Sequence, residues 1–165
     1  EHLLGTTISR VDLDLPEIQA ASLEEVTRAK LDAARAFAPH PVAVEDVSLE
    51  LDALGGFPGP FVKWLLASAG GDGLSAMVQG LSSNAATARC IVARWDGETV
   101  LLAEGSVAGH VLAEPRGSTE FGWDAWFLPE GSSRTYGEMT RDEKRETSHR
   151  ALAWRRMSRL LTLKP

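Results

Sequence analysis

The sequence predicts an α/β fold with a mixed β-sheet and flanking helices, and three observations support this class. Capping-box patterns open helical segments, an Asp96-Gly97 turn joins two strand-like segments, and a short apolar run lies between two helices. The hairpin supplies an antiparallel strand pair, and crossover connections permit parallel pairs. A chain of 165 residues suits one domain, which we place at residues 1–165.

The first elements are predicted from capping and alternation. Residues 1–5 resemble the last turn of a helix, with a frayed tail as the alternative, and residues 6–13 alternate as a strand does. Ser22 and Glu25 form a capping box that opens a helix over residues 23–37. The expected apolar stripe of this helix consists of Val26, Ala29, Ala33 and Phe37.

Apolar runs and glycines define the rest of the chain. Residues 42–44 are predicted as a short buried strand that ends at Glu45 and Asp46. A helix begins near Pro60 and is broken at the glycine-rich residues 70–73 before it resumes. The later predicted elements are a hairpin of residues 88–95 and 99–104, a mostly irregular segment over residues 115–129, a short helix capped by Thr140 and Glu143, and a longer helix over residues 149–161.

Composition and charge narrow the classes of function. With 44% hydrophobic and 24% charged residues, the chain has the composition of a soluble globular protein. Its net charge of -6 argues against nonspecific binding to nucleic acid or to acidic membranes. The single cysteine, Cys90, cannot form an internal disulfide, and no apolar run has the length of a membrane span. We therefore expect a cytoplasmic protein with neither a nucleic-acid nor a membrane partner.

Three acidic residues follow strand-like segments. Glu45 and Asp46 come directly after the predicted buried strand, and Glu17 lies on a loop after the first strand. Ligands often bind at the carboxyl ends of strands in open α/β sheets, and carboxylate oxygens suit Mg²⁺. A magnesium site is one interpretation, and solvated loop acids are the other that the spacing leaves open.

Lysines and aromatic residues are the other candidates. Lys30 lies close to the apolar stripe of its helix, so its head group can enter a cleft, and Lys63 lies near the start of the next helix. Residues 121–127 are dense in aromatic side chains, which can stack on a base. The candidate phosphate contacts at the junction of the last two helices are Lys144, His149 and Arg150. Ordinary solvated charges and a small hydrophobic cluster are the alternatives.

Several specific segments occur in one order along the chain. They are Asp14-Leu15-Pro16-Glu17, Val44-Glu45-Asp46, Leu54-Gly55-Gly56-Phe57-Pro58-Gly59-Pro60, Lys63-Trp64, Pro115-Arg116-Gly117, Phe121-Gly122-Trp123-Asp124 with Phe127, Tyr136, Glu138-Met139, Glu143-Lys144 and Ser148-His149-Arg150. Together they resemble the inosine triphosphate pyrophosphatase family, the noncanonical purine nucleoside triphosphate pyrophosphatases. The resemblance covers most of the chain, and the Leu54 and Phe121 blocks are its most specific parts.

The resemblance implies a fold and an activity. The expected fold is an elongated mixed sheet with flanking helices that form two lobes around a central cleft. The expected activity is Mg²⁺-dependent hydrolysis of ITP, dITP or XTP between the α- and β-phosphates, which releases a nucleoside monophosphate and pyrophosphate. The family is usually dimeric, so a homodimer is expected.

The resemblance also assigns roles to residues. Glu17 and Asp46 match the acids that hold Mg²⁺, with Mn²⁺ as an alternative metal, and Asp46 is the candidate to orient or deprotonate water. Glu45 is a candidate helper. The residues that match substrate contacts are Lys30, Lys63, Phe121, Gly122, Trp123, Asp124, Lys144, His149 and Arg150, with Phe121 as the stacking face.

Two features depart from the family pattern. The family begins with a strand and a Thr-Gly-Asn-x-x-Lys loop that cradles the triphosphate, and we expect such a segment upstream of Glu1. Without it, we expect residues 1–165 to be less soluble and at least about 10²-fold less active. Val47 stands where the family commonly has a hydroxyl residue. An active pyrophosphatase is the first interpretation, and a truncated or degenerate member that binds nucleotide or dimerises without efficient turnover is the second.

Overall fold

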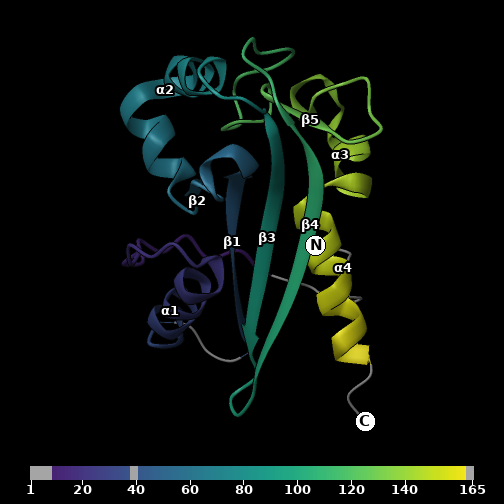
Figure 1. Ribbon diagram of the computed structural model, residues 1–165. Helices are drawn as coiled ribbons and strands as arrows, with labels where there is room; N and C mark the ends of the chain where they lie inside the picture. Colours follow the sequence, from purple (N-terminus) through teal and green to yellow (C-terminus); the bar gives the residue numbers. More distant parts are fainter. Residues whose placement is uncertain (1–8, 38–40, 163–165) are drawn as a thin grey trace.

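The computed structural model describes residues 9–37 and 41–162. Within them, one sheet holds five strands in the order β2-β1-β3-β4-β5. The strands are β1 (Val42–Leu51), β2 (Pro58–Gly59), β3 (Ala85–Trp95), β4 (Val100–Val111) and β5 (Phe127–Pro129). The three long strands, β1, β3 and β4, make the sheet elongated (Figure 1).

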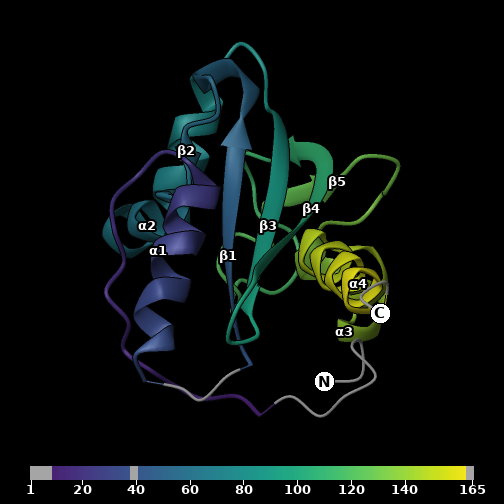
Figure 2. The same ribbon diagram turned by 90° about the horizontal axis from the view of Figure 1, so that it is seen from below.

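Helices flank this sheet in two groups. They are α1 (Leu23–Arg35), α2 (Val62–Gln79), α3 (Arg141–Thr147) and α4 (His149–Thr162), with short 3-10 turns at η1 (Asp52–Leu54) and η2 (Tyr136–Glu138). In both views α1 and α2 lie toward one side of the molecule and α3 and α4 toward the other (Figure 1 and Figure 2). In the described ranges, no helix combines the length and the apolar character needed to cross a membrane.

The α/β class and the elongated sheet with flanking helices are confirmed. Each strand pair of the described residues is antiparallel, so the parallel neighbours expected of a mixed sheet are not found there. The topology explains the difference. Helix α2 makes a crossover from β2 to β3, and these two strands do run in the same direction, but the antiparallel strand β1 lies between them.

Two predicted elements near the start of the chain differ from the structure. Residues 9–13 do not form a strand, because no described strand supplies the hydrogen-bonding partner that a strand needs, while residues 1–8 lie outside the described part. Helix α1 ends at Arg35, so Phe37 lies beyond it and is exposed. The buried stripe of α1 instead consists of Leu23, Val26, Thr27, Leu31 and Ala34.

Strand β1 is longer than predicted, and this correction matters for the site. The predicted strand ended at Glu45 and Asp46, whereas the observed strand continues to Leu51. Alternation persists through Val47, Leu49 and Leu51, of which the last two are buried. Glu45 and Asp46 therefore lie inside a strand, where consecutive side chains point to opposite faces of the sheet.

Two glycines explain the predicted break in α2. Gly70 has φ of 65°, a left-handed conformation that glycine adopts without strain, and it interrupts the helix there. At Gly71 a Cβ would lie 2.1 Å from the ring of Trp126, so only a hydrogen fits. The indole of Trp126 donates to Ser75 Oγ at 2.8 Å, which joins α2 to the segment before β5.

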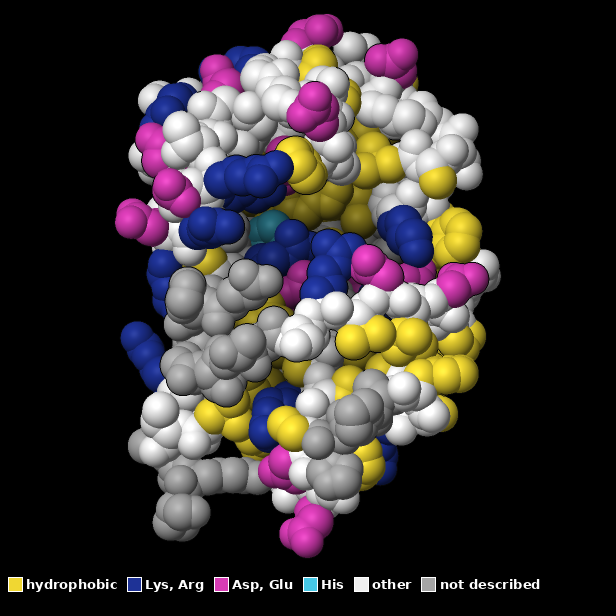
Figure 3. All heavy atoms as spheres, turned by 180° about the vertical axis from the view of Figure 1, so that it is seen from behind, with side chains coloured by type: hydrophobic (Ala, Val, Ile, Leu, Met, Phe, Trp, Pro, Cys, Tyr) yellow, Lys and Arg dark blue, Asp and Glu magenta, His cyan; other side chains and the backbone are white. Residues whose placement is uncertain are grey.

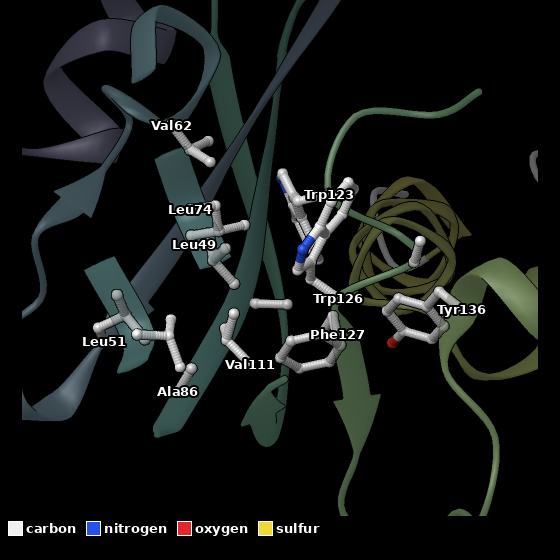
Figure 4. Close-up of a cluster of buried hydrophobic side chains, with 13 residues drawn as sticks. Leu49, Leu51, Val62, Leu74, Ala86, Val111, Trp123, Trp126, Phe127 and Tyr136 are labelled. Atoms are coloured by element: carbon white, nitrogen blue, oxygen red, sulfur yellow. The ribbon is translucent and has the colours of Figure 1, made fainter. Parts of the chain in front are cut away.

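The hydrophobic core divides into two clusters. The main cluster lies between the sheet, α2 and the segment that leads into β5 (Figure 4); its largest members are Leu49, Leu51, Leu74, Trp123, Trp126, Phe127 and Tyr136. The second cluster joins the sheet to α4 and consists of Cys90, Val92, Ala103, Ala153 and Met157, with Val47 and Trp154 among the partly buried residues packed on it. Helix α1 packs separately against β1 and β3.

Candidate active site

A cavity of about 480 Å³ opens between α1, α2, β1 and the segment that carries Gly122 and Trp123. Its charged lining residues are Glu17, Lys30, Asp46 and Lys63, and its apolar lining includes Ile18, Val26, Val47, Phe61, Val62, Leu66 and Trp123. Lys and Arg side chains gather around a hollow with a hydrophobic floor on the face shown in Figure 3. An apolar cavity of this size with a few converging charges is typical of a small-molecule site.

Two carboxylates from separate segments converge on one lysine. Lys30 of α1 places Nζ 3.2 Å from Oδ2 of Asp46 on β1 and 3.6 Å from Oε1 of Glu17 on the loop before α1. Lys63, at the start of α2, donates to the other oxygen of Glu17 at 2.7 Å. These four candidate residues therefore lie together in the structure.

The lysines keep Glu17 ionised. Burial alone would raise the pKa of the Glu17 carboxyl, but the hydrogen bond from Lys63 and the charges of Lys30 and Lys63 outweigh it, and the pKa lies below its ordinary value. Asp46 is held by a second contact, since its Oδ1 accepts the N–H of Val47 at 2.9 Å. Both acids are thus oriented as acceptors toward the cavity.

The donor set fits a hard divalent cation. Mg²⁺ is usually held by one or two carboxylates together with water and substrate phosphates, and Glu17 and Asp46 supply that pair. An ammonium already lies between their oxygens, at the distances given above. In the described ranges, no group of three or more His, Cys, Asp and Glu side chains could enclose a metal by itself. The rest of the coordination sphere would therefore come from water and the bound ligand.

Glu45 serves the opposite face of β1. Because it is the neighbour of Asp46 in a strand, its side chain points away from α1 and toward α4. Its Oε1 lies 2.6 Å from Nε of Arg150, and its Oε2 accepts a hydrogen bond from Nε1 of Trp154 at 2.5 Å. Glu45, a candidate helper of the acid pair, is thus engaged by α4 instead.

An aromatic stack lies behind the cavity wall. The ring of Trp123 stacks on His149 with centroids 5.3 Å apart and meets Phe127 edge-on at 5.5 Å. His149 is 4% exposed, and its Nδ1 has no hydrogen-bond partner in the described residues. Burial, followed by the charges of Arg150 and Lys144, lowers the pKa of His149 to about 3. The imidazole is therefore neutral at physiological pH.

The remaining predicted contacts lie around this stack. Phe121 is exposed, with the guanidinium of Arg141 5.8 Å from its ring centroid. Asp124 forms a direct ion pair with Lys144, whose Nζ is 5.3 Å from the ring centroid of Tyr136. The exposed ring of Phe121 is thus three residues from Asp124, which is paired with Lys144.

The structure separates the predicted residues into two sets. Those that line the cavity are Glu17, Lys30, Asp46, Lys63, Gly122 and Trp123. Those outside its lining are Phe121, Asp124, Lys144, His149 and Arg150. Sequence reasoning missed Trp154, although its place four residues after Arg150 puts both on one helix face. It also missed Gly105 of β4, where a Cβ would lie 2.2 Å from the carbonyl oxygen of His149.

The fold and this site can be compared with known proteins. A match to the Ham1 family spans residues 2–160, which is nearly the whole chain. The chain belongs to the Ham1 family. In this Ham1-family member Val47 belongs to the cavity lining and also packs on the second cluster with Trp154.

Relatives and solved structures agree with membership of the Ham1 family. An inosine triphosphate pyrophosphatase of Puccinia graminis f. sp. tritici is 44% identical over 154 residues, covering 93% of this chain and 79% of the relative. A dITP/XTP pyrophosphatase of Thermococcus kodakarensis is 39% identical over 160 residues, covering 96% of this chain and 85% of the relative. The structure of the Staphylococcus aureus Ham1 protein superposes with a TM-score of 0.76 at 21% identity, covering 93% of this chain and 83% of that one. This last likeness concerns the fold.

Proposed function

We propose that this chain hydrolyses noncanonical purine nucleoside triphosphates (ITP, dITP and XTP) to the nucleoside monophosphate and pyrophosphate. The observation that carries the proposal is the convergence of Glu17 and Asp46 on the ammonium of Lys30 in the wall of the cavity. The substrates named for the relatives at 39% and 44% identity support this choice of nucleotide.

The charged residues account for the phosphate chemistry. Phosphoryl transfer depends on positioning and charge neutralisation, and Mg²⁺ or Mn²⁺ supplies part of that neutralisation when bound. Glu17 and Asp46 would hold the metal, and Asp46 orients or deprotonates the attacking water. Lys30 and Lys63 exchange their carboxylate partners for phosphate oxygens when the nucleotide binds.

The aromatic segment accounts for the choice of base. Phe121 offers an exposed stacking face, while Gly122 and Trp123 form the adjacent cavity wall. Asp124 and Lys144, with His149 and Arg150, supply polar groups for the base and nucleotide. A donor directed at a 6-oxo group would be left unpaired, or would clash, against a 6-amino group, which disfavours adenine.

The test is pyrophosphate release from ITP, XTP and ATP under the same conditions with saturating Mg²⁺. We expect kcat/KM for ITP or XTP to exceed that for ATP by at least about 10², the scale of a mismatched polar contact. The product assay must show pyrophosphate rather than orthophosphate. The matched variant is Asp46→Asn, which should fold normally and turn over at least about 10²-fold more slowly.

Two results would contradict the proposal. Equal kcat/KM values for ITP and ATP would show that the base site is misassigned. Near-normal turnover of ITP by Asp46→Asn would show that the acid pair is misassigned. The homodimer and the cytoplasmic location expected for the chain stay predictions.

A further inference from the structure

Glu45 connects two residues of α4 that lie one helical turn apart. Its two carboxylate oxygens are engaged by different groups: Oε1 forms an ion pair with Nε of Arg150 at 2.6 Å, and Oε2 accepts a hydrogen bond from Nε1 of Trp154 at 2.5 Å. Residues four apart lie on one face of a helix, so α4 presents both side chains to the same carboxylate. The carboxylate therefore cannot rotate without loss of a contact.

The side chains of Trp154 and Arg150 differ in how firmly they are held. Trp154 packs on the second cluster together with Val47, which lies two positions from Glu45 on the same face of β1. The side chain of Arg150 is 52% exposed, and its contact with Glu45 is an ion pair made through Nε. The packed indole of Trp154 thus fixes the carboxylate of Glu45, and this carboxylate in turn restrains the exposed guanidinium of Arg150.

This chain of contacts ends beside the cavity. Val47 belongs to both the cavity lining and the cluster that holds Trp154. On the other side, Trp123 lines the cavity and stacks on His149, the residue before Arg150. Through Val47 and Trp123, the cavity lining is thus connected to the part of α4 that carries Arg150.

We propose that Trp154 is a positioning residue that holds Arg150, through Glu45, in the orientation that binds the nucleotide. The inference rests on the proposed function. A free arginine loses rotamer freedom when it binds a ligand, and a guanidinium that is already oriented loses less. Trp154 touches neither substrate nor metal in this account and acts on affinity alone.

The kinetic test compares two variants that break the same chain of contacts. Trp154→Phe keeps an aromatic ring on the cluster and removes the N–H, while Glu45→Gln keeps the shape and removes the charge. Each should raise KM for ITP by about 3- to 10-fold and leave kcat within about twofold. The double variant should be no worse than the more impaired single variant, because both act on one path. Trp95→Phe is the matched control; Trp95 lies at the end of β3 under the guanidinium of Arg35, 4.2 Å from the ring centroid, and its loss should leave KM unchanged.

A spectroscopic measurement reads the contact without turnover. The five tryptophans give five indole N–H signals in a ¹H–¹⁵N spectrum of the folded protein. The signal lost in Trp154→Phe should be the one that shifts in Glu45→Gln, while the other indole signals keep their positions. This selective shift reports the contact itself, and the rise of KM at unchanged kcat distinguishes positioning from a merely structural role.

The outcomes separate the two proposals. If the unchanged chain releases pyrophosphate from ITP and both single variants keep its KM, the positioning role is wrong and the proposed function stands. Additive effects on KM, or no shift of the Trp154 signal in Glu45→Gln, would also overturn the positioning role. If Trp154→Phe unfolds, Glu45→Gln decides alone. No pyrophosphate release by the unchanged chain would overturn the proposed function and this inference with it.

Discussion

Lys30 lies between the two acids that we propose as metal ligands. Its Nζ is 3.2 Å from Asp46 and 3.6 Å from Glu17, and the three side chains are 22%, 19% and 21% exposed. An ammonium at these distances neutralises the two carboxylates and keeps them together. It also competes with any other cation for the same oxygens.

Loss of the Lys30 ammonium should relieve that competition. In Lys30→Met, we expect Mn²⁺ to bind about 3- to 10-fold more tightly in the absence of nucleotide, because two partly exposed ion contacts no longer oppose it. Turnover should fall at the same time, since Lys30 is a proposed phosphate contact. Metal affinity is measured by titration of free Mn²⁺ with electron paramagnetic resonance.

Lys63→Met is the control for this effect. Its Nζ contacts Glu17 at 2.7 Å, but its side chain is largely exposed and the described structure pairs it with one acid of the two. The gain in Mn²⁺ affinity should therefore be smaller than for Lys30→Met. Unchanged or weaker Mn²⁺ binding by Lys30→Met would show that the lysine does not act as a competing cation.

At the scale of elements, the position of α4 depends on a close approach to β4. A Cβ at Gly105 would lie 2.2 Å from the carbonyl oxygen of His149 and 2.3 Å from the amide nitrogen of Ala153. The contacted atoms are backbone, so they cannot move aside as a flexible side chain would. The first turn of α4, which carries His149 and Arg150, therefore sits directly on this glycine.

Gly105→Ala should displace α4 from the sheet. We expect a loss of about 1–3 kcal/mol in the free energy of unfolding, the cost of overpacking a tight contact, together with weaker nucleotide binding. Gly80→Ala is the matched control, because its Cβ would meet Met77 O at an ordinary 3.6 Å and its φ of -84° suits alanine. Urea unfolding and ITP binding are measured for both variants, and equal stability of Gly105→Ala and Gly80→Ala would contradict this account.

At the scale of the whole molecule, stability is linked to a buried histidine. His149 lies at the start of α4 and stacks on Trp123 of the main cluster, and burial lowers its pKa from 6.5 to about 3. The unfolded chain therefore takes up a proton near pH 6.5, whereas the folded chain does so only near pH 3. The stability that His149 contributes is present above pH 6.5 and is lost as the pH falls toward 3.

The expected loss is about 2 kcal/mol between pH 7.5 and pH 5, at about 1.4 kcal/mol for each pH unit below 6.5. His149→Gln, which does not titrate, should remove most of this slope and lower stability at pH 7.5. Urea unfolding at several pH values between 5 and 7.5 measures how the free energy of unfolding depends on pH. Carboxyl groups with a lowered pKa, such as Glu17, act mainly below their ordinary value of 4.5 and so outside this window. A variant with the slope of the unchanged chain would show that another group is responsible.

Short-range signals predicted the local structure well. The side chain of Ser22 accepts the amide of Glu25 at the start of α1, and Thr140 and Glu143 form the predicted capping box of α3. The Asp96-Gly97 turn joins β3 and β4 as expected. Such caps and turns are completed by atoms a few residues apart, so the local sequence suffices to specify them.

Long-range pairing accounts for what the sequence left open. Residues 115–129 are predicted to be mostly irregular, and the exception, Phe127–Pro129, forms β5 because β4 supplies its partner. The length of β1 likewise depends on β3, which pairs with it from Val42 to Leu51. Strand boundaries depend on such neighbours, which periodicity does not identify.

By itself, the sequence determined the capped helices, the hairpin, the α/β class and the residue types of the acid, lysine and aromatic groups. Only the tertiary structure decided how those groups are divided. It directs Asp46 to Lys30 and the adjacent Glu45 to Arg150 and Trp154, because a strand sends neighbouring side chains to opposite faces. Glu45 and Trp154 are 109 positions apart, and a contact across that separation exists only once β1 and α4 have packed together.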